Sequence, residues 1–185
     1  MQPERICDPA DLEEIYALRV AAWRARVESF PDIGRWTDAE DARAAHWAIR
    51  EDGRIVAAAR LSIHDSLAEV PHAEIFDGVF SRMMEGPIAS LNRLVVAPSH
   101  SGKGFSEALD RVRVGHARDM KCRHAIGETF SAARVSQLGT LGFQAVGSAR
   151  PYRSGPLALV SGDPSTAESA APVATVIHLS IDAVV

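Results

Sequence analysis

The chain has 185 residues, 46% of them hydrophobic and 24% charged, with a formal net charge of −4 at pH 7. This length and composition are typical of one globular domain with its own core, and the negative charge argues against a nucleic-acid partner. No apolar run is long enough to cross a membrane, and none resembles a signal peptide. The two cysteines show no metal-ligand spacing. We therefore expect a cytoplasmic protein with no metal, no membrane contact and no nucleic-acid partner.

The first part of the chain predicts a helix followed by a hairpin. Apolar side chains recur at helical spacing over residues 9–23, and an acidic first turn suits the helix dipole. A polar stretch over residues 32–41 predicts a second, short helix. The apolar runs 45–50 and 54–63 flank Glu51-Asp52-Gly53, which is a turn signal, so we expect these runs to pair as a hairpin.

The middle of the chain contains a segment longer than a turn. Within residues 70–86 apolar side chains repeat with helical period from Ile75 onwards, which predicts an inserted helix. The elements expected after it are a strand over 88–96, a helix over 104–121, a strand over 125–130, a helix over 132–140 and a strand over 143–147.

The character of the sequence changes after Tyr152. Residues 161–172 are small, polar and low in complexity, which predicts a flexible loop. Residues 173–181 alternate between apolar and polar side chains, so they predict a final strand, for which residues 157–160 are the expected partner. The sequence contains no internal repeat.

The most informative segment joins an apolar strand to a helix. The strand ends at Pro98, and two glycines follow, Gly102 and Gly104, on either side of Lys103. N–H groups at a helix start favour an anion, and glycines let a phosphate approach the main chain. The segment is not a Walker loop, because Ala97 replaces the first glycine, nor a dinucleotide loop, which needs a third glycine. It predicts an anion-binding loop; the alternative is a glycine-rich turn that caps an ordinary amphipathic helix.

Two segments, in the right order, resemble the GNAT superfamily of N-acyltransferases. Residues 96–106 are similar to its pyrophosphate loop, V-x-P-x-x-[QR]-G-x-G-x-[GA], except that Ser101 replaces Gln or Arg and Ser106 replaces Gly or Ala. Residues 131–143, which end in Gly142-Phe143, resemble its N-x-x-A-x-x-L-Y-x-x-L-G-F segment. Both serines keep a backbone N–H, so the loop retains its ability to cradle a phosphate.

The resemblance implies an α/β (α+β) fold, with a GNAT-like mixed, mostly antiparallel central sheet of about seven strands flanked by helices, in a single domain over residues 1–185. It implies an N-acyltransferase that moves an acetyl or longer acyl group from acetyl-CoA or another acyl-CoA, its cosubstrate, to the amine of a small molecule or peptide. A homodimer is an open alternative to a monomer. The implied cosubstrate-binding residues are Leu94, Val95 and Val96, through their backbone, and Ser101, Gly102, Lys103, Gly104, Phe105 and Ser106.

One branch of the superfamily has a similar order of motifs. N-acyl amino acid synthases and acyl-homoserine-lactone synthases show R-L, an apolar insert with a helix, and then E-x-S-R-F-x-V. Arg60, Leu61, Arg93 and Val96 fit this pattern, whereas Ser90 stands in place of the acid. This resemblance implies an acyl carrier protein as an alternative donor and the insert as a wall for a long acyl tail. Alternatively, the apolar residues of the insert pack in the hydrophobic core and contact no acyl tail.

The family's usual side chains for proton transfer are missing, because its tyrosine acid falls at Leu138 and its strand glutamate at Ser90. Acyl transfer to an amine needs a base for the amine and a proton for the leaving thiolate. The candidates are Glu128, the nearest acid to the expected cleft, together with Asn92 and Ser131. Each has a structural alternative, such as a solvated strand-end charge or a helix N-cap. A module that binds acyl-CoA without turnover therefore stays an alternative to an enzyme.

Overall fold

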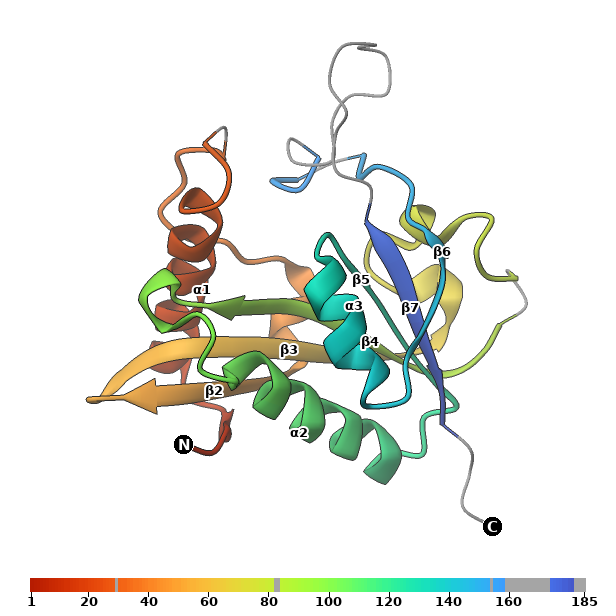
Figure 1. Cartoon of the computed structure of the whole chain (residues 1–185), viewed down its shortest axis with the longest axis horizontal. Helices are drawn as coiled ribbons and strands as arrows, with labels where there is room; N and C mark the ends of the chain where they lie inside the picture. Colours follow the sequence, from red (N-terminus) through yellow and green to blue (C-terminus); the bar gives the residue numbers. More distant parts are fainter. Residues whose placement is uncertain (29, 82–83, 154, 159–173, 182–185) are drawn as a thin grey trace. The chain divides into compact units, whose positions relative to one another are not determined.

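The computed structural model describes residues 1–28, 30–81, 84–153, 155–158 and 174–181 (Figure 1). Its strands are β1 (Glu4–Ile6), β2 (Ala45–Glu51), β3 (Arg54–Ser66), β4 (Glu85–Val96), β5 (His124–Thr129), β6 (Gln144–Ser148) and β7 (Thr175–Ser180). The α-helices of the described residues are α1 (Pro9–Arg24), α2 (Phe105–Asp119) and α3 (Ala132–Gly139).

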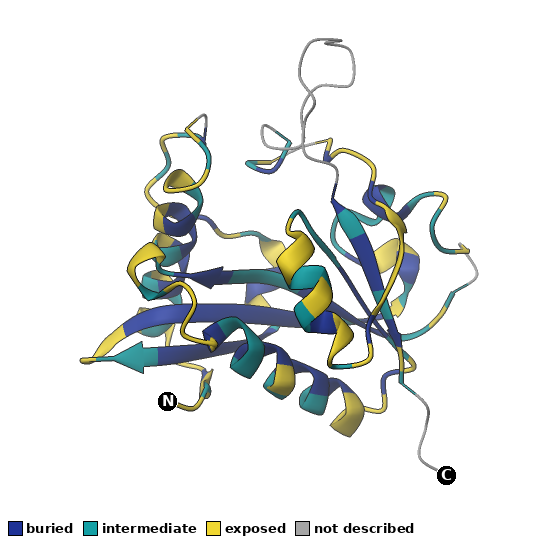
Figure 2. Ribbon diagram, in the orientation of Figure 1, coloured by how far each residue is buried: buried dark blue, intermediate teal, exposed yellow. Residues whose placement is uncertain are grey.

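The strands form one seven-stranded sheet in the order β1-β2-β3-β4-β5-β7-β6. The pairs β1–β2, β2–β3, β5–β7 and β6–β7 are antiparallel. β3 is buried along most of its length, whereas the edge strand β6 is exposed throughout (Figure 2). A mixed α/β fold with a mostly antiparallel sheet of seven strands confirms the expected fold class.

The chain divides into two compact units, of which the first comprises Met1–Ser62 and Leu91–His116. Its helix α1 starts at Pro9, where a missing N–H costs nothing, and Asp8 Oδ1 caps it by accepting from the Ala10 N–H at 2.8 Å. One face of this helix is buried. The core that it helps to form contains Ile6, Ile15, Tyr16, Ala22, Ala48, Ile55, Ala58 and Val95.

The β2–β3 hairpin of the first unit forms as the sequence predicts. Glu51 lies opposite Arg54, and the turn between them consists of Asp52 with φ 52° and Gly53 with φ 77°. A two-residue hairpin turn with positive φ at both positions favours Asp-Gly, because glycine adopts this conformation without steric cost.

The second unit comprises Ile63–Ser90 and Ala117–Val185, and in it β7 lies between β5 and β6. Ile177 of β7 lies opposite Gly127 of β5 on one side and Ala145 of β6 on the other. The expected pairing of the last strand with residues 157–160 is therefore wrong. Leu157 lies in a turn instead, and residues 159–160 and the predicted loop 161–172 lie outside the described residues. Alternation identifies a strand, but it carries no information about which strand lies beside it.

The predicted helix over residues 70–86 is also wrong, because the described part of this segment holds no α-helix. The insert, defined here as residues 67–81, contains two 3₁₀ turns, Leu67–Glu69 and Ala73–Phe76, and β4 already starts at Glu85. His72 at φ 57° and Gly78 at φ 87° lie in the left-handed region, which an α-helix cannot pass through. Two of the apolar residues that suggested a helix, Ile75 and Phe76, are core residues of the second unit, each 1% exposed.

The short helix expected within residues 32–41 is a 3₁₀ turn, Ala39–Ala42, capped by Asp38.

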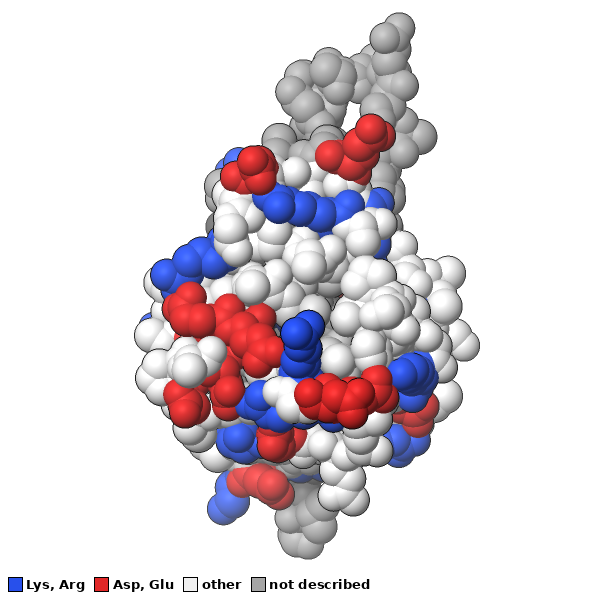
Figure 3. All heavy atoms as spheres, turned by 90° about the vertical axis from the view of Figure 1, so that its left-hand side faces the viewer, with Lys and Arg blue, Asp and Glu red and all other residues white. Residues whose placement is uncertain are grey.

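On the face of the molecule shown in Figure 3, acidic and basic side chains lie next to one another. Among the described residues, no helix is both long enough and apolar enough to span a bilayer.

Candidate active site

The loop between β4 and α2 has the geometry of an anion cradle. It contains the 3₁₀ turn Pro98–His100, and the Ala97 N–H donates to the Val56 carbonyl at 2.8 Å, which ties the loop to β3. Gly102 and Gly104 both have φ 79°, and a Cβ placed on either would meet nothing within 4 Å. The space in front of both glycines is therefore open to an approaching group.

Helix α2 begins directly after this loop. Its hydrogen-bond ladder starts where the Ala108 N–H donates to the Gly104 carbonyl at 3.1 Å. A helix cannot use the N–H groups of its first turn in its own ladder, and its dipole places partial positive charge there. Phe105 is buried and fixes the start of the helix in the core. Loop and helix together suit a phosphate group.

Glu51 at the end of β2 contacts two side chains of this loop, Lys103 and His100. Lys103 Nζ donates to both Glu51 carboxylate oxygens, at 3.1 and 3.2 Å. His100 Nε2 bonds to the same carboxylate, and Ser99 Oγ lies 2.8 Å from His100 Nδ1. The hydrogen bonds from Lys103 and then His100 hold the pKa of Glu51 below its ordinary value. The sequence prediction included Lys103 but missed its carboxylate partner.

Arg93 distorts β4 immediately before the residues expected to bind the cosubstrate. Its φ of 53° is uncommon for a non-glycine residue. The guanidinium carbon lies 4.3 Å from the centroid of the Trp36 ring, and Nη2 donates to Asp38 Oδ2 at 2.7 Å. In the following segment, residues 94–96, the two valine side chains are buried, so at Val95 and Val96 only the backbone is suited to the predicted role.

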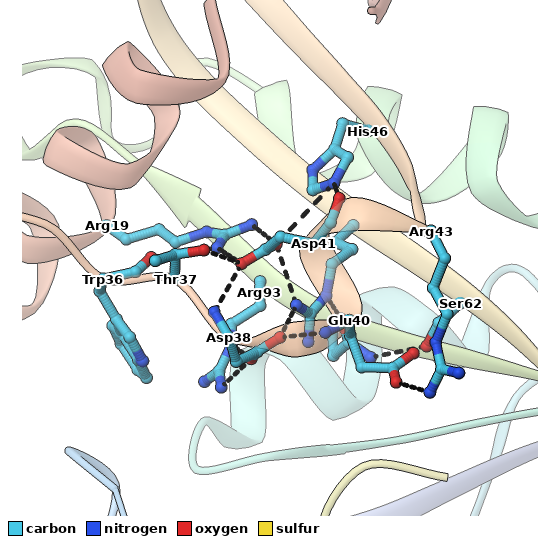
Figure 4. A network of polar contacts seen from close by, with 12 residues as sticks. Arg19, Trp36, Thr37, Asp38, Glu40, Asp41, Arg43, His46, Ser62 and Arg93 are labelled. Carbon is cyan, nitrogen blue, oxygen red and sulfur yellow. Dashed lines mark hydrogen bonds and ion pairs between the residues drawn. The ribbon is translucent and has the colours of Figure 1, made fainter. Parts of the chain in front are cut away.

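A buried ion-pair network surrounds this distortion in the first unit (Figure 4). Asp41 accepts two parallel hydrogen bonds from Arg19 and one from Arg60, all at 2.9 Å. Asp38 accepts from Arg60 and from Arg93. The Asp41 side chain is 2% exposed and that of Asp38 is 29% exposed. Within this network three guanidinium groups face two carboxylates, which leaves one positive charge in excess.

The network sets the charge state of its members. Burial raises the pKa of Asp41, but hydrogen bonds and charge from Arg19 and then the charge of Arg60 outweigh it, so the pKa lies below its ordinary value. His46 Nε2 lies 3.0 Å from the Asp41 backbone carbonyl, which only accepts, so this nitrogen carries the ring proton. Burial lowers the pKa of His46. Its Nδ1 has no hydrogen-bond partner within the described part of the chain.

Asn92, one of the catalytic candidates, is part of the same network. Its Oδ1 accepts from Arg60 Nε at 2.5 Å, and its Nδ2 donates to Ser62 Oγ at 3.3 Å. Its backbone carbonyl accepts from Arg113 Nη1 at 3.3 Å. These contacts give the Asn92 side chain a structural role, and a catalytic role stays a prediction.

The other two catalytic candidates lie in the second unit. Glu128 is in β5, and its Oε1 accepts a hydrogen bond from the Tyr152 hydroxyl. Ser131 is the N-cap of α3, where its Oγ accepts from the Arg134 N–H at 3.4 Å. Leu138 is buried in α3 and offers no proton.

Sequence reasoning missed several residues of these clusters. Asp38 and Asp41 have no motif of their own, since they meet Arg19 only through the fold. The one feature of the sequence that points to Tyr152 is that tyrosine is rare in it, since the chain has only two tyrosines. Among the described residues, no group of three or more His, Cys, Asp or Glu side chains is placed to hold a metal ion.

The family model for the acetyltransferase (GNAT) family matches residues 12–139, which is more than half of the chain. The chain belongs to this family. The matched region includes the loop, α2, β5 and all of α3, and family membership makes the chain an N-acetyltransferase by class. No curated protein sequence matches it.

Solved structures of the GNAT fold resemble the chain over nearly its whole length. Polyamine N-acetyltransferase from Drosophila melanogaster has a TM-score of 0.69 at 15% identity, over 97% of this chain and 100% of that one. The N-acyl amino acid synthase FeeM, from uncultured soil microbes, has a TM-score of 0.68 at 12% identity, over 96% and 89%. An acetyltransferase from Bacillus subtilis, crystallised with CoA, has a TM-score of 0.60 at 12% identity, over 97% and 98%. At these identities the similarity establishes the fold alone.

Proposed function

We propose that the chain is a single acyltransferase domain that transfers an acetyl or longer acyl group from acyl-CoA to the amine of a small molecule or peptide. The observation that carries the proposal is the loop with Gly102 and Gly104, both at φ 79° with open space before them, directly ahead of α2. A pyrophosphate fits this loop because it can approach the main chain and the helix start together.

The roles of the donor-binding residues follow from their places in the chain. The loop residues that hold the pyrophosphate are Ser101, Gly102, Lys103, Gly104, Phe105 and Ser106. Backbone groups of Leu94, Val95 and Val96 bind the pantetheine amides and polarise the thioester carbonyl. Such contacts do not depend on side chains, which agrees with the burial of the two valine side chains.

The reaction needs two proton transfers, one from the acceptor nitrogen and one to the leaving sulfur. The acceptor nitrogen attacks the thioester carbonyl carbon, the C–N bond forms, and the C–S bond then breaks. Glu128 takes the proton that the nitrogen loses. The departing CoA sulfur takes a proton from the Ser131 hydroxyl, which solvent reprotonates while Glu128 releases to solvent the proton that it took from the amine; Asn92 is a further candidate polar group. The products are the amide and free CoA thiol, so atoms and charge balance.

A second candidate is an enzyme similar to N-acyl amino acid or acyl-homoserine-lactone synthases, with an acyl carrier protein as donor. The observation that favours it is the network of Arg60 and Arg93 with Asp38 and Asp41, whose excess positive charge suits an acceptor that carries a carboxylate. Comparison of acyl-CoA with acyl carrier protein as donor, using one acceptor, distinguishes the two candidates.

Binding of acetyl-CoA to the loop is testable by calorimetry on two variants of Gly104. Gly104→Ala and Gly104→Glu carry the same penalty for a side chain at positive φ, but only glutamate adds length and a negative charge in the open space. We expect Gly104→Glu to abolish measurable binding and Gly104→Ala to weaken it far less. Equal affinities of Gly104→Glu and wild type would show that the phosphates bind elsewhere.

A further inference from the structure

Tyr152 contacts the proposed base directly. Its hydroxyl donates to Oε1 of Glu128, 24 positions away in the chain. Tyr152 is 7% exposed and Glu128 is half-buried, and a hydrogen bond to an ionised acceptor is stronger than one between neutral groups. Glu128 lies opposite Val176 of β7, and the strand pairing fixes its backbone.

The segment that carries Tyr152 is held on two sides. The Ala149 N–H donates to the Ala174 carbonyl at 2.7 Å, just before β7. The Arg150 N–H donates to the Ile75 carbonyl of the insert at 2.8 Å. The insert, which the sequence suggested as a wall for an acyl tail, thus fixes the approach of Tyr152 to β5.

The insert also restrains the tyrosine ring. The rings of His72 and Tyr152 meet edge to face, with centroids 5.0 Å apart and planes at 72°. His72 has φ 57°, a conformation that costs a non-glycine residue energy and persists where the surrounding structure imposes it. Charged groups among the described residues of this region include Glu74, 3.7 Å from His72 Nδ1, and the pair Arg150–Asp77 at 3.6 Å.

We propose that Tyr152 is a positioning residue for Glu128. Its hydroxyl orients the carboxylate and favours the ionised form, in which Glu128 accepts the proton of the acceptor amine. Tyr152 keeps its own proton throughout, and the amine proton passes to Glu128 as the C–N bond forms. The inference rests on the proposed function, in which Glu128 is the base.

The proposal makes the effects of two substitutions interdependent. Tyr152→Phe removes only the hydroxyl and leaves the ring against His72. We expect it to lower kcat about tenfold, within the range of a hydrogen bond to a charged group, and to leave the KM for acyl-CoA unchanged. The acidic limb of its pH–rate profile moves to higher pH, because the carboxylate has lost a donor that favours ionisation.

The decisive comparison is the double variant. Glu128→Gln alone lowers kcat by about 10²–10⁴-fold, and adding Tyr152→Phe to it lowers kcat no further, since Tyr152 acts through the charge of Glu128. Tyr16→Phe, the same change at the other tyrosine, is the control and keeps the wild-type kcat and profile. Thermal unfolding confirms that each variant is folded.

Several results would overturn the proposal. Independent, multiplying effects of the two substitutions would show that Tyr152 does not act through Glu128. An unchanged pH–rate profile for Tyr152→Phe would show the same. Full activity of Glu128→Gln would remove the base itself, and with it this inference, while acyl transfer by the chain would stand.

A measurement without turnover separates this inference from the proposed function. Carboxyl resonances of carbon-labelled glutamate report the titration of Glu128 in the protein without ligands, with Glu128→Gln assigning the signal. We expect the midpoint to lie at higher pH in Tyr152→Phe than in wild type. Equal midpoints would contradict the inference even in a protein that acylates no amine.

Discussion

Asp41 is the carboxylate on which the buried network of the first unit depends. It compensates two guanidinium groups, those of Arg19 and Arg60, in surroundings where neither is exposed to water. A buried pair of this kind adds little net stability over apolar packing, but removing one partner leaves a buried charge unpaired. The network therefore fixes one arrangement of α1, the 3₁₀ turn Ala39–Ala42 and β3.

Asp41→Asn keeps the shape of the side chain and removes its charge, so we expect it to lower the free energy of unfolding by about 3–5 kcal/mol. Asp32→Asn is the matched control, since Asp32 pairs with Arg24 on the surface and its side chain is fully exposed; its expected cost is at most about 1 kcal/mol. Urea unfolding measures both. Equal costs would show that the buried network contributes no more than a surface pair.

The stability that Asp41 contributes depends on pH in a definite direction. The pKa of Asp41 is lowered in the folded chain from an ordinary value of 3.8, so its ionised form stabilises the fold above that value. This contribution disappears as the pH falls from 3.8 towards the folded pKa. The difference in stability between wild type and Asp41→Asn should therefore be constant near neutral pH and narrow in acid.

The insert is the element whose role differs most from its sequence-based interpretation. Ile75 and Phe76 are each 1% exposed, and Phe80 packs against His178 of β7 with ring centroids 5.6 Å apart. Ile75 and Phe76 therefore belong to the core of the second unit, whereas Phe80 is only half-buried. A residue that is fully packed by protein atoms has no surface to offer an acyl tail.

We expect Phe76→Ala to destabilise the chain by about 3–5 kcal/mol while the affinity ratio of octanoyl-CoA to acetyl-CoA stays at its wild-type value. Each buried methylene of a tail would contribute about 0.8 kcal/mol, so a tail against Phe76 would make the ratio sensitive to this residue. Denaturation and calorimetry provide the two measurements. A ratio that collapses in Phe76→Ala would place the insert beside the acyl chain.

For the molecule as a whole, the sequence predicts correctly those elements whose geometry is set by residues that are neighbours in the chain. The Asp52-Gly53 turn and the sequence from Pro98 to Gly104 each contain their own geometry, so the hairpin and the loop before α2 were correctly predicted. The three-residue strand β1 carries too short a pattern to be recognised. The partners of β7 depend on pairings between distant segments, which alternation within one strand does not encode.

Some residues of the candidate site can likewise be identified from the sequence, and others only from the tertiary structure. The glycine loop and Glu128 can be identified from residue type and place in the chain. Tyr152 reaches Glu128 only because β6, β7 and the insert fix its segment, and the Arg19–Asp41 pair joins residues 22 positions apart. Contacts of this kind follow from tertiary structure, and no spacing rule predicts them.

The central claim is that this chain moves an acyl group from CoA to an amine, and release of CoA thiol measures it directly. Acetyl-CoA and octanoyl-CoA are each incubated with wild type and with Gly104→Glu, with and without a panel of small-molecule and peptide amines. We predict thiol release that requires an amine, equals the amide formed, and is lost in Gly104→Glu. Acyl-CoA binding without amine-dependent release on any member of the panel would contradict the claim and identify the chain as a binding module.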